Sequence, residues 1–270
     1  AALGGVVVKG LSAEPRRGNP TPRIVETPSG MLNSIGLQNV GVRAFVAELL
    51  PELERRGVSV VANIFGYEAK HYAEVASVLE AAEGVSAIEI NISCPNVKEG
   101  GVAFGNDPDM SARVVAACRA QTSKPLITKL SPNQTSIQEN ARLCIEAGTD
   151  GFAVINTLMG MAIDAEARRP VIGNVQGGLS GPAIKPIALL KVHQVYQVAK
   201  PHGVPIIGQG GITTATDAIE FMIAGAAAVG VGTALFYDPL VCRKINDGIA
   251  DYLGRHGLTA VDELVGTLAT

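Results

Sequence analysis

The sequence predicts an α/β fold with a parallel sheet, and two observations lead to that prediction. Short runs of apolar, largely β-branched residues alternate with amphipathic segments along the whole chain of 270 residues. The chain holds about seven such strand–helix pairs and starts on a strand. Strict alternation is typical of an open, doubly wound sheet or of a (β/α)8 TIM barrel. We prefer the barrel, lacking its first β/α unit, and the open sheet is the alternative.

Each predicted strand is nearly all apolar, as expected for a parallel strand that is covered on both faces. The predicted strands span residues 5–9, 58–64, 87–92, 125–130, 151–156, 205–208 and 228–232. The predicted helices span residues 42–56, 68–83, 108–122, 135–147, 184–199, 214–225 and 239–254. Asp107 before Pro108 is a typical helix start. We expect residues 1–270 to form a single barrel domain that is incomplete at its N-terminus.

Composition narrows the class of protein. Apolar residues make up 47% of the chain and charged residues 17%, which favours a folded core over disorder. A net charge of -3 argues against nucleic acid or an anionic membrane as the main partner. The four cysteines include no CxxC pair, and no signal peptide is visible. The sequence therefore indicates a cytoplasmic protein.

Three predicted loops are longer than the usual two to six residues: 10–41, 93–107 and 157–183. Each follows a predicted strand, and in a barrel such loops project from the face that carries active sites. This favours an enzyme. No histidine and no cluster of carboxylates lies at a predicted strand end, which argues against a metal-dependent hydrolase.

Two glycine-rich loops predict a phosphate-binding site. Gly210 and Gly211 follow the predicted strand at 205–208, and Gly232 and Thr233 follow the next one. Glycine lets backbone N–H groups approach a phosphate, and a helix N-terminus favours an anion. The loops after the last two strands of a barrel often form such a site. Tight turns without a ligand are the alternative.

Cys94 follows a predicted strand in the segment Asn-Ile-Ser-Cys-Pro-Asn at residues 91–96. A thiolate can act as a base or a nucleophile, so Cys94 is a candidate catalytic residue. A half-buried small residue is the alternative. The remaining cysteines lie among apolar residues of predicted helices, and we expect them to be core thiols. They are Cys118, Cys144 and Cys242.

Lys9 and Lys129 end apolar strands, so each needs an anionic partner or must reach solvent at the rim. Asn63 and Asn156 also close strands, where an amide offers a donor and an acceptor to a planar ring. A pocket lined by amides suits a heterocycle that carries carbonyl and N–H groups. The amides expected to line it are those of Asn33, Asn91, Asn96 and Asn156.

The sequence resembles the class 1 dihydroorotate dehydrogenases, which are flavin enzymes of pyrimidine synthesis built on a (β/α)8 barrel. The resemblance extends over nearly the whole chain. Its motifs lie at residues 8–10, 18–23, 31–39, 91–98, 177–182 and 208–212. Residues 96–101 and 161–164 resemble the 1B subtype. That subtype passes electrons to NAD through a partner subunit that carries FAD and a 2Fe–2S cluster.

The resemblance implies that Cys94 removes a proton from C5 of dihydroorotate while hydride passes from C6 to N5 of FMN. The residues implied to hold the substrate are Lys9, Asn33, Ser34, Ile35, Gly36, Leu37, Asn91, Asn96, Asn156 and Thr157. Those implied to bind FMN are Lys9, Gly10, Asn63, Asn91, Lys129, Ile155, Gly181, Gly210, Gly211, Gly232 and Thr233. The implied assembly is a homodimer of this chain within a heterotetramer.

Two other functions stay open. A reductase similar to dihydropyrimidine dehydrogenase would share the barrel, the FMN and the active cysteine, although Asn96 after Cys94-Pro95 favours dihydroorotate. A non-catalytic scaffold for the partner subunit is the other alternative, and the presence of both Cys94 and Lys9 argues against it.

Overall fold

The structure is a computed structural model that describes residues 3–92 and 106–269. The chain divides into two compact units. Unit 1 contains Thr21–Ser34 and Ala153–Thr270 together with the first three residues, and unit 2 contains Gly4–Pro20 and Ile35–Phe152. Strand β7 (Gly151–Val154) carries the chain from unit 2 into unit 1. Among the described residues, no helix is long and apolar enough to span a membrane.

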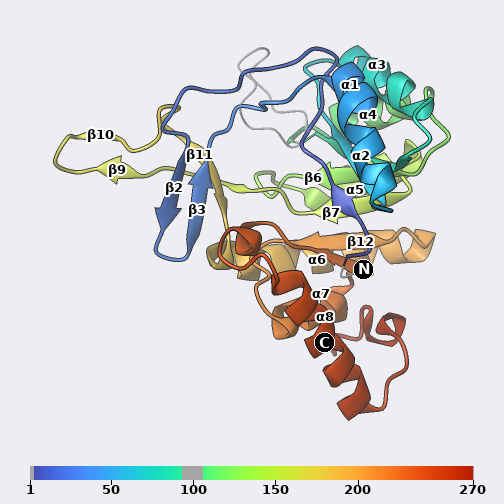
Figure 1. Ribbon diagram of the computed structural model, residues 1–270. Helices are drawn as coiled ribbons and strands as arrows, with labels where there is room; N and C mark the ends of the chain where they lie inside the picture. The colour runs from blue at the N-terminus through green and yellow to red at the C-terminus, as the bar shows by residue number, and fades with distance from the viewer. Residues whose placement is uncertain (1–2, 93–105, 270) are drawn as a thin grey trace. The chain divides into compact units, whose positions relative to one another are not determined.

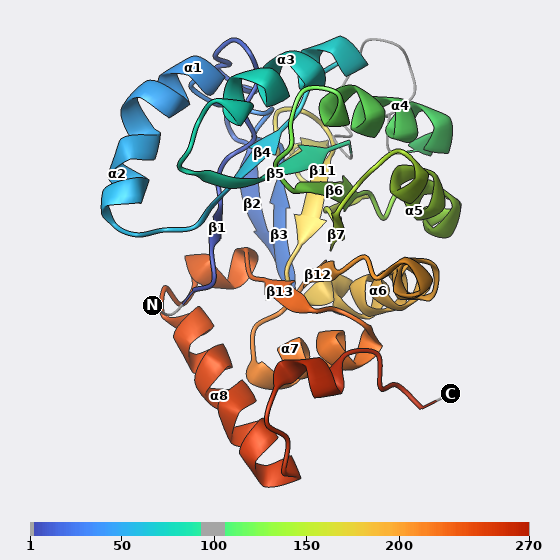
Figure 2. The same cartoon turned by 90° about the vertical axis from the view of Figure 1, so that its right-hand side faces the viewer.

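Unit 2 consists of parallel strands that alternate with helices (Figure 1). Its strands pair in the order β1 (Val6–Val7), β4 (Val60–Ile64), β5 (Val85–Asn91), β6 (Leu126–Leu130) and β7. Helices flank these strands in Figure 2, the longest being α3 (Ala69–Glu80), α4 (Pro108–Arg119) and α5 (Ile137–Glu146). The predicted helix at 42–56 consists of α1 (Val42–Ala44), a π-helical turn (Phe45–Leu49) and α2 (Leu50–Arg55).

Strands β4, β5 and β6 of unit 2 are largely buried because helices cover their outward face (Figure 2). Val60, Ile64, Ile88 and Ile90 are all fully buried, as expected for parallel strands that are covered on both sides. The predicted helix start at Asp107 is confirmed, since its carboxylate accepts hydrogen bonds from the N–H groups of the first turn of α4.

Unit 1 continues the alternation of strand and helix. Strands β12 (Ile206–Gln209) and β13 (Ala228–Gly230) are parallel neighbours. The helices are α6 (Lys185–Ala199), α7 (Ala215–Ala224) and α8 (Val241–His256). Short 3-10 turns span Pro182–Ile184, Lys200–His202, Thr233–Phe236 and Val261–Leu264. With the strands of unit 2, the described parallel strands number seven, as the sequence predicts.

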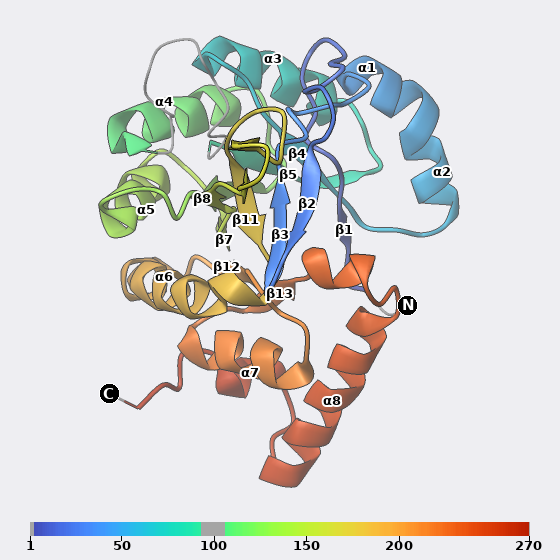
Figure 3. The same cartoon turned by 90° about the vertical axis from the view of Figure 1, so that its left-hand side faces the viewer.

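A second, antiparallel sheet in unit 1 was not predicted from the sequence (Figure 3). Its strands pair in the order β2 (Ile24–Thr27), β3 (Gly30–Asn33), β11 (Gly177–Ser180) and β8 (Leu158–Gly160). The prediction that 10–41 and 157–183 are loops is therefore wrong where these strands lie. These strands have at most four residues each and lack a clear alternation of apolar and polar side chains, so local pattern could not reveal them.

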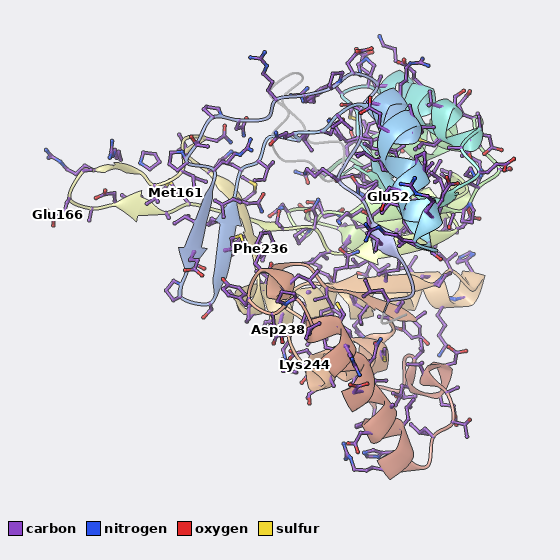
Figure 4. The ribbon with its side chains drawn as sticks, in the orientation of Figure 1. Glu52, Met161, Glu166, Phe236, Asp238 and Lys244 are labelled. Carbon is purple, nitrogen blue, oxygen red and sulfur yellow. The ribbon has the colours of Figure 1, made fainter. Side chains whose placement is uncertain are left out.

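A hairpin of β9 (Ile163–Asp164) and β10 (Arg169–Pro170) projects from this antiparallel sheet. Figure 4 shows Met161 and Glu166 along it, and Met161 is 55% exposed. Nearer the start of α8, Lys244 and Asp238 form an exposed ion pair with 2.6 Å between Nζ and Oδ2.

Candidate functional site

The residues predicted to form the site lie in both units, and each unit holds its own cluster. The predicted base Cys94 and the predicted amide ligand Asn96 lie outside the described residues.

In unit 2, polar side chains from three adjacent strands meet on one face of the sheet. Asn63 on β4 lies opposite Glu89 on β5, and Asn91 on β5 lies opposite Lys129 on β6. Register partners point to the same face, as do residues two apart on one strand, so these four side chains share a face. The amide of Asn63 donates to Oε1 of Glu89 at 2.5 Å, and Nζ of Lys129 lies 3.4 Å from the same oxygen.

The sequence predicts that Lys9 and Lys129 each pair with an anion or reach solvent, and the structure shows one of each. Lys129 has found an anionic partner: its side chain is 17% exposed, and that of Glu89 is fully buried. Lys9, just after β1, is exposed to solvent. Gly10 is buried against Asn63, where a Cβ atom would lie 2.7 Å from Oδ1. Only glycine fits there without displacing the amide.

Asn91 ends β5 and is half-buried. Its carbonyl oxygen accepts a hydrogen bond of 3.0 Å from the hydroxyl of Tyr72, which is fully buried on α3. This bond ties the last residue of β5 to the helix that covers the sheet. It fixes the backbone from which the segment containing Cys94 continues.

The predicted substrate loop at residues 35–37 is also in unit 2, and it is held by backbone bonds. The carbonyl of Ile35 accepts from the N–H of Asn19 at 3.0 Å. Gly36 and Leu37 both adopt left-handed backbone conformations, with φ of 74° and 61°. A side chain at Gly36 would collide with Asn19. The loop therefore needs glycine at this position.

In unit 1, the predicted phosphate loops come together. Gly211 has a φ of 78°, and a Cβ atom on it would lie 2.7 Å from the carbonyl oxygen of Gly181. Next to Gly181, the hydroxyl of Thr233 donates to Ser180 at 2.8 Å. Gly210 precedes this contact, and Gly232 has no atom within 4 Å of its Cβ position. The backbone at Gly232 is thus open, as a phosphate site requires, while Gly210 and Gly211 pack closely against neighbouring atoms that leave no room for a side chain.

A charged network anchors the glycine loop at the start of α7. One oxygen of the Asp217 carboxylate accepts from the N–H groups of Thr213 and Thr214 at 2.9 and 2.8 Å. The other accepts from Nζ of Lys185 at 2.6 Å. Burial alone would raise the pKa of Asp217, but these donors hold it well below its usual range. The sequence prediction missed this network.

The predicted substrate residues of unit 1 lie at the antiparallel sheet and beside it. Asn33 ends β3 and donates to the carbonyl of Gly178 on β11 at 3.3 Å. Asn156 accepts from the N–H of Thr157 at 2.7 Å, and Thr157 packs against Gly178. Asn33 and Thr157 thus both contact one residue of β11. Ser34 and Ile155 are buried, with 1% and 3% of their surface exposed.

Two further polar residues of these clusters were missed, Glu89 and Ser180. Glu89 could have been noticed, because it is a charged residue inside an otherwise apolar strand. Ser180 lies within the glycine-rich motif at 177–182, and its hydroxyl accepts from Thr233 and donates to the carbonyl of Met31.

The described cysteines are poor candidates for a reactive thiolate. Cys118 and Cys144 are fully buried, and burial raises the pKa of each thiol to about 12. The prediction of core thiols is confirmed for these two. Cys242 is only half-buried, and burial again raises its pKa.

Comparison with known proteins places this arrangement in a family. Residues 1–253 match the family model of dihydroorotate dehydrogenase. A relative in Trichlorobacter lovleyi is 57% identical over 266 residues, which cover 98% of this chain and 86% of that protein. Relatives in Pelobacter propionicus and Geotalea daltonii are 55% and 54% identical with the same coverage. All three bear the name dihydroorotate dehydrogenase B (NAD(+)), catalytic subunit.

A solved structure supports the fold independently. The crystal structure of a dihydroorotate dehydrogenase from Eimeria tenella, in complex with ferulenol, matches with a TM-score of 0.84 over 98% of this chain and 79% of that one. At 24% identity this likeness shows the fold alone. It confirms the predicted α/β barrel, while the family model and the named relatives confirm the predicted family and enzyme class. This chain belongs to the dihydroorotate dehydrogenase family.

Proposed function

We propose that this chain oxidises dihydroorotate to orotate in pyrimidine biosynthesis, as an FMN-dependent catalytic subunit. The observation that carries the proposal is the family match over residues 1–253, together with relatives at 52–57% identity that bear one name. The two clusters support it, because one offers polar groups for a planar ring and the other offers glycine backbone, open at Gly232, for a phosphate.

The residues present fit FMN. Lys129 and Asn63 are held by a buried carboxylate, and a side chain at Gly10 would displace the amide of Asn63. In unit 1, a Cβ atom at Gly211 would fill the space beside Gly181. We assign the ring to Lys9, Gly10, Asn63, Asn91, Lys129 and Ile155, and the phosphate and its neighbourhood to Gly181, Gly210, Gly211, Gly232 and Thr233. The chemistry that FMN supplies when bound is acceptance of the hydride from C6 of dihydroorotate.

We assign the substrate to residues that offer amides, a cation and loop backbone. An amide can donate to a ring carbonyl and accept from a ring N–H, and a lysine can pair with the carboxylate of dihydroorotate. The assigned residues are Lys9, Asn33, Ser34, Ile35, Gly36, Leu37, Asn91, Asn96, Asn156 and Thr157.

Cys94 is assigned as the base that takes the proton from C5. A neutral thiol is a poor base, so Cys94 must be partly ionised in the working complex. The anionic substrate opposes that ionisation, and a lysine charge favours it. Lys9, which is exposed and follows β1, can supply such a charge.

The test is Cys94→Ser, which replaces the thiol by a much weaker acid. We expect the variant to bind FMN fully but to reduce it at least about a hundredfold more slowly, because a positioned base contributes about that factor. Anaerobic stopped-flow absorbance measures the rate after dihydroorotate is added. Cys242→Ser on α8 is the matched control and should reduce FMN at the wild-type rate.

Three outcomes would contradict the proposal. Reduction of Cys94→Ser at the wild-type rate would remove the assigned base. Faster bleaching of the wild-type protein by dihydrouracil than by dihydroorotate would favour the related reductase. A wild-type protein that binds FMN but is bleached by neither substrate would favour a scaffold.

We further propose that electrons leave this chain for NAD through a separate subunit that carries FAD and a 2Fe–2S cluster. The names of the relatives, which specify NAD(+) and a catalytic subunit, support this. We propose a cytoplasmic heterotetramer with two copies of each chain. Co-expression with a candidate flavin and iron–sulfur protein, followed by measurement of NAD reduction and of mass in solution, tests the assembly.

A further inference from the structure

Glu89 is a carboxylate in a place that normally excludes one. It lies on the central part of β5 between Ile88 and Ile90, and none of these three residues is exposed. A buried charge is costly unless its partners compensate for the water that it has lost. An apolar side chain at this position would avoid the cost of removing a charge from water, as Ile88 and Ile90 do on either side. The carboxylate therefore needs an explanation beyond packing.

The hydrogen bonds of Glu89 are unevenly distributed. Oε1 accepts from Asn63 at 2.5 Å and faces Nζ of Lys129 at 3.4 Å. Oε2 has no hydrogen-bond partner among the described residues, although it is completely buried. Lone pairs of Oε2 that are left unsatisfied represent a loss of stability. Among the described residues, the interactions of the Glu89 carboxylate are therefore those with Asn63 and Lys129.

The contact with Asn63 determines how that amide is oriented. An ionised carboxylate only accepts hydrogen bonds, so the NH2 group of Asn63 must face Glu89. Oδ1 of Asn63 then faces the opposite way, toward Gly10, where an added Cβ would lie 2.7 Å from it. Glu89 thus presents the acceptor of Asn63 to the surroundings of Gly10 rather than its donor.

In the contact with Lys129, the negative charge of Glu89 partly offsets the positive charge of the ammonium group. The ammonium group is 17% exposed and its carboxylate partner is not exposed at all, so water screens the pair weakly. A cation beside a flavin stabilises the negative charge that the flavin gains on reduction. A carboxylate behind that cation reduces the effect.

We infer that Glu89 is a positioning residue for FMN: it orients the amide of Asn63, holds Lys129 and lowers the reduction potential of the bound flavin. This inference rests on the proposed function, because it requires FMN at Asn63 and Lys129. Glu89 itself touches neither the cofactor nor the substrate. It acts through the two side chains that it binds.

Glu89→Gln separates charge from shape. The side-chain carbonyl of glutamine still accepts a hydrogen bond from Asn63, but the negative charge behind Lys129 is removed. We expect FMN affinity within about threefold of wild type and an equilibrium constant for two-electron reduction that is about tenfold higher, equivalent to about 30 mV. Glu89→Ala also removes the acceptor and should weaken FMN binding at least about tenfold.

The measurements use the full chain. Titration of the apoprotein with FMN, followed by quenching of flavin fluorescence, gives the affinity, and equilibration with a redox dye gives the potential. Glu139→Gln, on the exposed surface of α5, removes the same charge far from any assigned residue and should leave both unchanged. Circular dichroism identifies a variant that fails to fold, and Glu89→Gln keeps the test decisive if Glu89→Ala does.

The outcomes separate the two proposals. A purely structural Glu89 would change the unfolding temperature of Glu89→Gln but not the flavin potential, and that result would overturn the inference alone. A potential that falls in Glu89→Gln would do the same. A wild-type apoprotein that binds no FMN would overturn the proposed function and this inference with it.

Discussion

Gly211 shows how one missing side chain can define a binding loop. Its backbone has a φ of 78°, and a Cβ atom there would lie 2.7 Å from the carbonyl oxygen of Gly181 and 3.0 Å from Cβ of Lys185. Backbone atoms cannot yield as a flexible side chain can. The close approach of this loop, which we assign to phosphate, to Gly181 therefore depends on residue 211 being glycine.

We expect Gly211→Ala to lower both stability and flavin content. The left-handed conformation and the collision together should reduce the free energy of unfolding by about 1–3 kcal/mol. Denaturant unfolding and the absorbance ratio of flavin to protein measure the two effects. Gly257→Ala is the control, because its φ is 67° but nothing lies within 4 Å of the added Cβ. That control should lose some stability and keep its FMN. Full flavin content in Gly211→Ala would contradict the assignment.

At the scale of the residue, the sequence allowed a prediction where a charged side chain stands in an otherwise apolar strand. The sequence predicts that Lys129 either has an anionic partner or reaches solvent at the rim, and the structure supplies Glu89 as the partner. The identity of that partner could not be predicted, because it depends on the register between β5 and β6. Register is a property of the assembled sheet and is not encoded in either strand alone.

At the scale of the element, helix α7 depends on a cap that binds more than its own first turn. Thr214 and Asp217 form a reciprocal capping box, and Asp217 also binds Lys185 from the start of α6. One carboxylate therefore fixes the start of α7, the end of the glycine loop and the preceding helix. Its low pKa reflects these charged and backbone donors.

The substitution Asp217→Asn should change how the free energy of unfolding depends on pH. The folded-state pKa lies below the unfolded value of about 3.9, so the carboxylate stabilises the fold above that pH and the effect is lost as pH falls through the folded-state pKa. We expect the variant to be about 1–3 kcal/mol less stable at pH 7, with the difference shrinking below about pH 4. Urea unfolding between pH 3 and 7 measures it. Asp247→Asn, exposed on α8, should show no such trend, and a pH-independent deficit in Asp217→Asn would refute this account.

The antiparallel sheet marks the limit of sequence reasoning for elements. The strands of the parallel sheet can be recognised in the sequence, because burial on both faces requires a continuous apolar run. Strands β3 and β11 pair through their backbones, with glycine at the start of each. A glycine-rich segment has no side-chain period, and its partner lies far away along the chain. Such strands become visible only when the chain has folded.

At the scale of the whole molecule, the residues assigned to FMN are distributed over both units. Asn63 and Lys129 belong to unit 2, while Gly181, Gly211 and Thr233 belong to unit 1. Sequence order predicted the barrel and the strand-end positions of these residues. It did not predict the division of the chain, because the excursion of Thr21–Ser34 into unit 1 depends on contacts with β11.

FMN should protect the backbone amides beside the residues that we assign to it. A ligand that binds only the folded state at a hundred times its Kd adds about 2.7 kcal/mol of stability. We expect hydrogen exchange to slow at residues 63–65 and 129–130 of unit 2 and at 208–212 of unit 1 when FMN is added to apoprotein. Residues 251–256 of α8 are the internal reference and should exchange unchanged. Unchanged exchange at 63–65 and 129–130 would contradict the assignment of Asn63 and Lys129 to FMN, and unchanged exchange at 208–212 would contradict that of Gly210 and Gly211.

The pairing of β3 with β11 has a consequence for biosynthesis. Asn33 and Gly178, which are joined by a hydrogen bond, are 145 residues apart in the sequence. A ribosome that adds about 5–20 residues per second therefore releases them roughly 7–30 seconds apart. During that interval the nascent hairpin of β2 and β3 has an open edge and no strand to close it. The hydrogen bond between Asn33 and Gly178 can therefore form only after the ribosome has translated β11.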